Sequence, residues 1–189
     1  MTSSEKYNSF QNESETDYSK SNNSNKSQTI IDPSKKRYPY CLVWSPIKIF
    51  SWFIPIIGHA GICNSEGIIY EFGPEHVKIE ELPFGPPTKY VLLELTEKQK
   101  NNYDKELEKS IQKYNKINFH FCGSNCHNFP VDVLNNLDYK GKNDYNVVNL
   151  WWMFLTKSKY VSNYGLFKTY IGFILVVIII YIIKNRFFK

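Results

Sequence analysis

The fold of this chain is decided by His59-Ala60-Gly61-Ile62-Cys63-Asn64-Ser65-Glu66-Gly67-Ile68-Ile69-Tyr70-Glu71-Phe72. Two apolar runs flank a short connection of turn-forming residues that ends on a glycine, a pattern typical of a β-hairpin. When such a hairpin closes around residues 64–67, the first strand begins where the second strand ends. We therefore expect His59 and Glu71 to lie side by side.

Further strands are predicted on both sides of this hairpin. Residues 41–44 form a short apolar run, residues 76–80 alternate between polar and apolar side chains, and residues 90–95 are mostly apolar. Alternation is the pattern of a strand that buries one face. A proline-rich loop at 83–87 separates the last two of these strands.

Three helices are predicted beyond the strands. Thr96 can cap the first, which runs to about Ile117, and its apolar stripe is packing surface made of Tyr103, Leu107, Ile111 and Tyr114. Pro130 lacks a backbone N–H and is tolerated only in a first turn, so the second helix starts at about Cys126. The third, over 147–161, is rich in aromatic residues and is a candidate for lying on a membrane surface.

The C-terminal run 170–183 contains no charged residue. Extended back to Gly165, it reaches the roughly 20 residues that a bilayer-spanning helix needs. Basic residues follow it directly and stop it. We predict a membrane anchor over residues 164–189, in a tail-anchor arrangement that leaves the main domain in the cytosol.

Composition divides the rest of the chain in two. Residues 1–36 are rich in Ser, Asn, Lys and Glu and nearly free of large aliphatics, so we predict a disordered polar tail. Residues 37–163 are left as the folded domain. The N-terminus has no apolar run of the kind found in secretory signals, so we expect the four cysteines to be free thiols in a reducing compartment.

A second apolar and aromatic segment covers residues 47–57. A lysine and a proline interrupt it, so it is too broken for a comfortable span. We expect a loop or short helix at the membrane surface, with three aromatic residues at headgroup level: Trp44, Trp52 and Phe53. The alternative is a re-entrant or spanning course for residues 42–57.

Cys126 is the best candidate nucleophile in the sequence. The partial positive charge of a helix N-terminus favours thiolate over thiol, and the unpaired N–H groups there can hold an oxyanion. His59 would act as a base, and Glu71 would orient its ring and raise its basicity. The alternative reading makes Cys126 a small buried hydrophobic residue and His59 and Glu71 ordinary strand-end residues.

Other classes of site are weaker. His120, Cys122, Cys126 and His127 are close in sequence, but adjacent Cys126 and His127 should point in different directions, and there is no C-x-x-C pair. This spacing is poor for a structural zinc site, so we expect neither a metal nor another cofactor. The net charge of +5 is scattered and accompanies no nucleic-acid-binding motif, so we expect no nucleic-acid partner.

Two blocks of the sequence resemble the lecithin:retinol acyltransferase-like proteins. The first is His59 to Glu71, and the second is Asn125-Cys126-His127-Asn128-Phe129, which is similar to an N-C-x-x-F block. These proteins are permuted members of the NlpC/P60 thiol hydrolases. The resemblance implies an α+β, papain-like fold with a small antiparallel sheet, packed helices and a C-terminal transmembrane helix. Glu71 departs from it, since those enzymes usually have His there.

A longer resemblance covers most of residues 38–165. Its motifs, Y-P-Y-C-L-V-W-S-P, I-G-H-A-G-I-C, F-G-P-P-T-K-Y and N-C-H-N, are similar to those of the reversion-to-ethylene-sensitivity family, which includes the transmembrane protein 222 group. The resemblance implies a membrane protein of the endoplasmic reticulum or Golgi.

Two functional hypotheses follow. The first is a membrane-anchored thiol acyl hydrolase or acyltransferase that acts on a membrane lipid or a lipidated protein. Its nucleophile would be Cys126, its base His59 and its orienting group Glu71. The second is a non-catalytic membrane regulator that binds and stabilises a membrane-protein partner.

Overall fold

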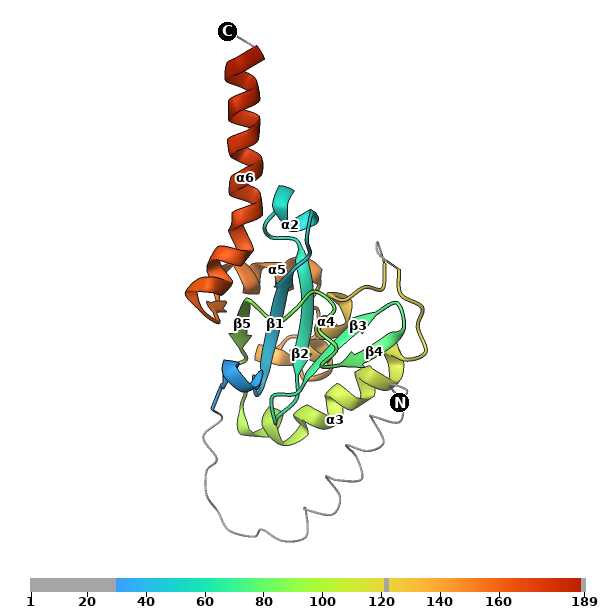
Figure 1. Cartoon of the computed structure of the whole chain (residues 1–189). Helices are drawn as coiled ribbons and strands as arrows, with labels where there is room; N and C mark the ends of the chain where they lie inside the picture. The colour runs from blue at the N-terminus through green and yellow to red at the C-terminus, as the bar shows by residue number, and fades with distance from the viewer. Residues whose placement is uncertain (1–29, 121–122, 188–189) are drawn as a thin grey trace. The chain divides into compact units, whose positions relative to one another are not determined.

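One antiparallel sheet forms the centre of the computed structural model, which describes residues 30–120 and 123–187 (Figure 1). Its strands run in the order β4-β3-β2-β1-β5-β6. Their bounds are β1 Cys41–Pro46, β2 Gly58–Cys63, β3 Ile69–Gly73, β4 His76–Ile79, β5 Lys89–Leu92 and β6 Lys159–Tyr160. The α+β class and the small antiparallel sheet expected from the sequence are confirmed.

The predicted hairpin is β2–β3. Its turn is closed by Asn64, whose side-chain oxygen accepts hydrogen bonds from the backbone N–H groups of Glu66 and Ile68. Gly67 has a φ of 87°, a conformation that side chains with a Cβ adopt at a cost. Its carbonyl accepts a hydrogen bond from the Tyr38 N–H, which ties the turn to the segment before β1.

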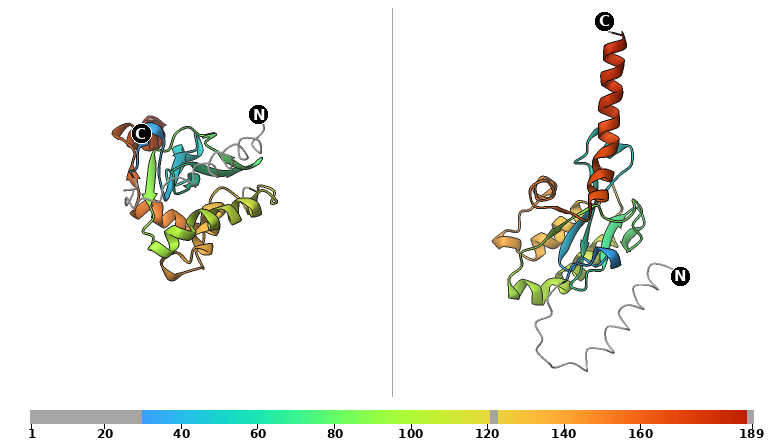
Figure 2. Two further views of the ribbon diagram at one scale, coloured as in Figure 1. Left: turned by 90° about the horizontal axis from the view of Figure 1, so that it is seen from below. Right: turned by 60° about the vertical axis from the view of Figure 1, so that its left-hand side comes forward.

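Helices α3 (Glu97–Tyr114), α4 (Asn128–Asn136) and α5 (Val147–Thr156) pack on one face of the sheet (Figure 2). Thr96 caps α3 through a reciprocal pair of hydrogen bonds with Gln99, as the sequence indicated. The predicted stripe of α3 is buried in the core between sheet and helices. The helix expected over 147–161 ends earlier, at Thr156, because residues 159–160 pair with β5 instead.

The opposite face of the sheet carries a smaller apolar cluster that includes Tyr38, Cys63 and Ile69. Ile31 packs against this cluster, and Arg37 pairs with Glu80. Within the segment predicted as a tail, residues 33–35 form the 310 helix η1 (Pro33–Lys35). The remainder of the predicted tail, residues 1–29, lies outside the described residues.

The apolar segment 47–57 joins β1 to β2 and contains one short helix, α2 (Phe50–Phe53). Ser51 closes it, because its hydroxyl donates a hydrogen bond of 2.6 Å to the Ile57 carbonyl. The expectation for Trp44 is wrong: its side chain is 1% exposed in β1, within the core, and does not reach headgroup level. Since residues 41–46 belong to the sheet, residues 42–57 do not form a continuous membrane span.

Helix α6 (Asn163–Phe187) extends from the domain (Figures 1 and 2). Within residues 30–120 and 123–187 it is the one helix long and apolar enough to cross a membrane. Its first turns are joined to the sheet, since the Thr169 hydroxyl donates to the Thr88 hydroxyl at 3.0 Å and Gly165 lies against the Thr88 backbone. The C-terminal helix predicted from the sequence is therefore present.

The hairpin turn gives the first testable prediction. Gly67→Ala combines an unfavourable φ with a Cβ placed 2.5 Å from the Tyr38 nitrogen. We expect it to lower the free energy of unfolding by more than about 2 kcal/mol, measured by urea unfolding of the full chain in detergent. Gly141→Ala is the matched control, because Gly141 has a φ of 72° and open space around it. Equal losses in the two variants would show that the contact with Tyr38 is unimportant.

Candidate functional site

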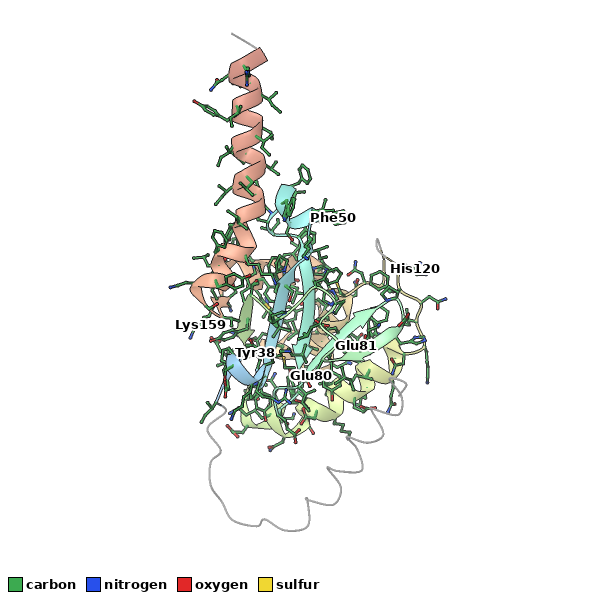
Figure 3. All side chains as sticks on the ribbon, in the orientation of Figure 1. Tyr38, Phe50, Glu80, Glu81, His120 and Lys159 are labelled. Carbon is green, nitrogen blue, oxygen red and sulfur yellow. The ribbon has the colours of Figure 1, made fainter. Side chains whose placement is uncertain are left out.

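A cavity of about 850 Å³ lies where α2, the β2–β3 hairpin, the loop before α4 and the start of α5 meet. That volume is within the range of small-molecule sites. Most of its wall is apolar or aromatic and includes Ile47, Phe50, Ile57, Phe84, Phe119 and Trp151. Figure 3 labels Phe50 on α2 and His120 on the loop that leads to α4. All three predicted site residues, His59, Glu71 and Cys126, line this one cavity.

His59 and Glu71 meet on one face of the sheet. The pairing register places Glu71 opposite Gly61, so His59, two residues before Gly61 in β2, is a diagonal neighbour of Glu71. The His59 Nε2 and Glu71 Oε1 atoms are 3.6 Å apart, and both side chains are buried. The Phe84 ring lies against the His59 ring, with 4.9 Å between centroids. The expected neighbourhood of these two residues is therefore present in the structure.

Cys126 is held in a turn immediately before α4. The helix begins at Asn128, two residues later than predicted, and Pro130 occupies its first turn. Asn125 and Asn128 clasp the turn: the Asn125 N–H donates to the Asn128 side chain, and the His127 N–H donates to the Asn125 side chain. Cys126 and His127 occupy the two central positions of this turn.

This turn brings the side chains of Cys126 and His127 together. The Cys126 Sγ and His127 Nδ1 atoms are 3.5 Å apart, so the expectation that they point in different directions is wrong. The Trp151 ring of α5 meets the His127 ring edge-on, with 5.8 Å between centroids. Sequence reasoning missed both His127 and Trp151 as cavity residues. The signal for His127 was its place in the Asn125–Asn128 turn.

Buried polar atoms without a hydrogen-bond partner are concentrated in this cavity. Among the described residues, such side-chain atoms are His59 Nε2, Glu71 Oε2, His127 Nε2 and Trp151 Nε1. All four residues line the cavity. Leaving a buried polar atom unpaired costs roughly 1–3 kcal/mol, so native proteins rarely tolerate several together. Their convergence is the chemistry expected of a site built to receive a polar group from a ligand.

Burial sets the protonation states of the site. It raises the pKa of the Cys126 thiol to about 11, so the expectation that a helix N-terminus would favour the thiolate is not met. Burial likewise lowers the pKa of His59 and that of His127 to about 4 each. It raises the pKa of Glu71 to about 7. At neutral pH the site therefore holds a thiol, two neutral imidazoles and a carboxyl that binds its proton more tightly than an ordinary glutamate.

Cys126 and His127 are in contact, but two side chains do not make a metal site. In the described part of the chain, no group of three or more His, Cys, Asp or Glu side chains is arranged to hold a metal ion. Cys122 lies outside the described residues.

Comparison with known proteins gives the family. The chain is 27% identical over 163 residues to the Arabidopsis thaliana protein Reversion-to-ethylene sensitivity1, covering 75% of this chain and 65% of that protein. It therefore spans less than two thirds of the length of this relative. No solved structure matches the chain. The family model described as RTE1-like matches residues 32–99 and 93–158, which together are more than half of the chain. The chain belongs to the RTE1-like family.

Proposed function

We propose that this protein is a membrane-anchored thiol acyl hydrolase or acyltransferase with a permuted NlpC/P60-type site. The observation that carries the proposal is the convergence of Cys126, His59, Glu71 and His127 on one apolar cavity, in which each of the two imidazoles and the carboxyl has one unpaired polar atom. An apolar wall suits an acyl chain, and unpaired nitrogen atoms suit its carbonyl end.

The proposed reaction begins with proton transfer from the Cys126 thiol to a neutral imidazole. Sulfur then attacks the carbonyl carbon of an ester or amide, and the C–O or C–N bond breaks as the leaving group takes the proton back. The product is a thioester on Cys126, which water or an acceptor alcohol or amine resolves. Proton transfer is required because a thiol with a raised pKa is a poor nucleophile.

Two imidazoles are available for this proton. His127 is in contact with the thiol, whereas His59 has a carboxyl neighbour. We assign the base to His59, because the Glu71 carboxylate would stabilise the imidazolium that forms. His127 then positions the thiol. Burial keeps both rings neutral, and a neutral ring can accept a proton.

We also propose a position for the site relative to the membrane. Helix α6 would hold the domain against a membrane of the endoplasmic reticulum or Golgi, with the cavity on the cytosolic side. The substrate would be a membrane lipid or a lipidated protein. No cofactor is needed for these steps.

A second candidate function is non-catalytic regulation of a membrane-protein partner. The name of the Arabidopsis relative describes a change in ethylene sensitivity and no chemical reaction. In addition, α5 exposes an apolar stripe at helical spacing, made of Val148, Trp152 and Leu155, which are 60–66% exposed. On this alternative the stripe binds the partner, and the cavity is an inherited feature of the fold.

A probe assay on the full chain separates the two candidates. An electrophilic acyl probe should label the wild-type protein and not Cys126→Ala. His59→Asn should slow labelling about 100-fold or more, the range of general-base catalysis, and His127→Asn should slow it less. The readout is the rate of probe incorporation into protein reconstituted in detergent or vesicles.

The nucleophile, the base and the enzymatic function can each be rejected by a different result of this assay. Labelling that survives Cys126→Ala rejects the nucleophile. A larger effect of His127→Asn than of His59→Asn transfers the base to His127. No labelling of wild type by any acyl probe, combined with full cellular function of Cys126→Ala, supports the regulator.

The raised pKa of Glu71 predicts a pH dependence of stability. An ordinary glutamate ionises near pH 4.5, whereas folded Glu71 keeps its proton until about pH 7. The folded state therefore binds more protons between these values, and its stability falls as the pH rises through 7. Relative to Glu71→Gln, the wild type should lose about 3 kcal/mol of unfolding free energy between pH 4.5 and 8.

Urea unfolding of both full-length proteins in detergent at several pH values measures this difference. His59 provides a control of opposite sign. Because its pKa is lowered, His59 reduces the stability of the folded state as the pH falls from 6.5 to about 4. His59→Asn should therefore raise the free energy of unfolding relative to the wild type at low pH only. Parallel pH profiles for the wild type and Glu71→Gln would show that Glu71 has the same pKa in the folded and unfolded states, so that its pKa is not raised.

A further inference from the structure

The segment 47–57 exposes an unusual amount of apolar surface outside α6. Its exposed large side chains, each 46–62% accessible, are Ile49, Phe50, Trp52, Phe53, Ile54 and Ile56. Contiguous apolar patches of this kind mark a contact with another apolar phase or partner. The contact between this segment and α6 indicates that the apolar phase is a lipid bilayer.

Helix α2 packs directly against α6 (Figures 1 and 2). The Trp52 ring lies on Gly172 so closely that a Cβ at that position would overlap it. Gly172 is four residues beyond Lys168 and twelve before Lys184, and no charged residue lies between those two lysines. At about 1.5 Å of rise per residue, Gly172 is about 6 Å inside the level of Lys168.

This contact fixes the depth of α2 in the membrane. When α6 spans, its charge-free run lies in a hydrocarbon core roughly 30 Å thick. Because Trp52 touches α6 within that run, Trp52 must lie in hydrocarbon too. The neighbouring Phe53 and Ile54 are exposed, so they face lipid and not water.

The same segment also lines the cavity. Ile47, Phe50 and Ile57 contribute to its wall together with Cys126 and His59. Phe50 lines the cavity and is 54% exposed, so we infer that it lies at a mouth of the cavity. Phe50 is two residues from Trp52, which contacts α6, so this mouth is close to the α2–α6 contact.

We propose that segment 47–57 is inserted in one leaflet and that Phe50 gates a lateral entrance through which a lipid acyl chain passes from the bilayer into the cavity. The chain would fill the apolar part, and its carbonyl would reach the unpaired nitrogen atoms of His59, His127 and Trp151. This inference rests on the proposed function for the fate of the chain. The entrance itself requires no reaction at Cys126.

Insertion is tested by tryptophan quenching in the full chain. The protein is reconstituted in phosphatidylcholine vesicles whose acyl chains carry bromine at a defined depth. Quenching should fall in Trp52→Phe and stay unchanged in Trp152→Phe, since Trp152 is 64% exposed on α5, away from the α6 contact. Equal quenching of Trp52→Phe and wild type would overturn insertion of the segment. Loss in Trp152→Phe alone would place α5 in the membrane instead.

Entry of a chain is tested with a photoreactive phosphatidylcholine that carries a diazirine at the end of one acyl chain. Cross-links should map to cavity residues such as Phe84 and Trp151. Phe50→Asp should reduce them about tenfold, because a charge at the mouth is costly in hydrocarbon. Phe50→Ala should keep or raise the yield. Val148→Asp is the charge control on an exposed α5 residue outside the cavity wall.

The outcomes separate the entrance from the chemistry. Cys126→Ala should cross-link as well as the wild type, so a failed acyl-probe assay with intact cross-linking rejects the proposed reaction alone. Cross-links confined to α6 and α2, or equal loss in Phe50→Asp and Phe50→Ala, would reject the lateral entrance.

Discussion

The register of the β2–β3 hairpin is the constraint on which the site depends. Gly61 pairs with Glu71, and the pairs of this ladder run from there back to the turn at Gly67. A slip of one residue would move His59 or Glu71 to the opposite face of the sheet and separate them. The turn chemistry that closes the hairpin therefore also brings an imidazole and a carboxyl within 3.6 Å.

The cavity differs from the rest of the core in how its buried polar groups are paired. Elsewhere the core is built from apolar side chains or from polar groups with partners, as in the Thr169–Thr88 and Ser51–Ile57 bonds. In the cavity, two imidazoles, a carboxyl and an indole keep polar atoms unpaired, which reduces stability. Proteins retain such groups where a bound molecule supplies the missing partner. Burial also keeps the two imidazoles uncharged at neutral pH, because it lowers the pKa of His59 and that of His127.

Local patterns predicted the elements but not their environment. The hairpin, the stripe of α3 and the C-terminal helix follow from spacing along the chain, so they could be read from sequence. His59, Glu71 and Cys126 could be named because their residue types carry chemistry. The burial of Trp44 and the raised pKa of Cys126 depend on packing between distant segments. No local pattern records such packing.

The join between the domain and α6 has a mechanical consequence. Two residues separate β6 from α6, and the hydroxyl bond from Thr169 to Thr88 fixes the first turns of the helix. A bilayer that differs in thickness from the charge-free run makes a spanning helix tilt. Because this short connection does not act as a flexible linker, such a tilt would rotate the whole domain and change the angle at which Phe50 meets the lipid. Bilayer thickness would thus act on this protein as a control of orientation, distinct from any effect of lipid chemistry.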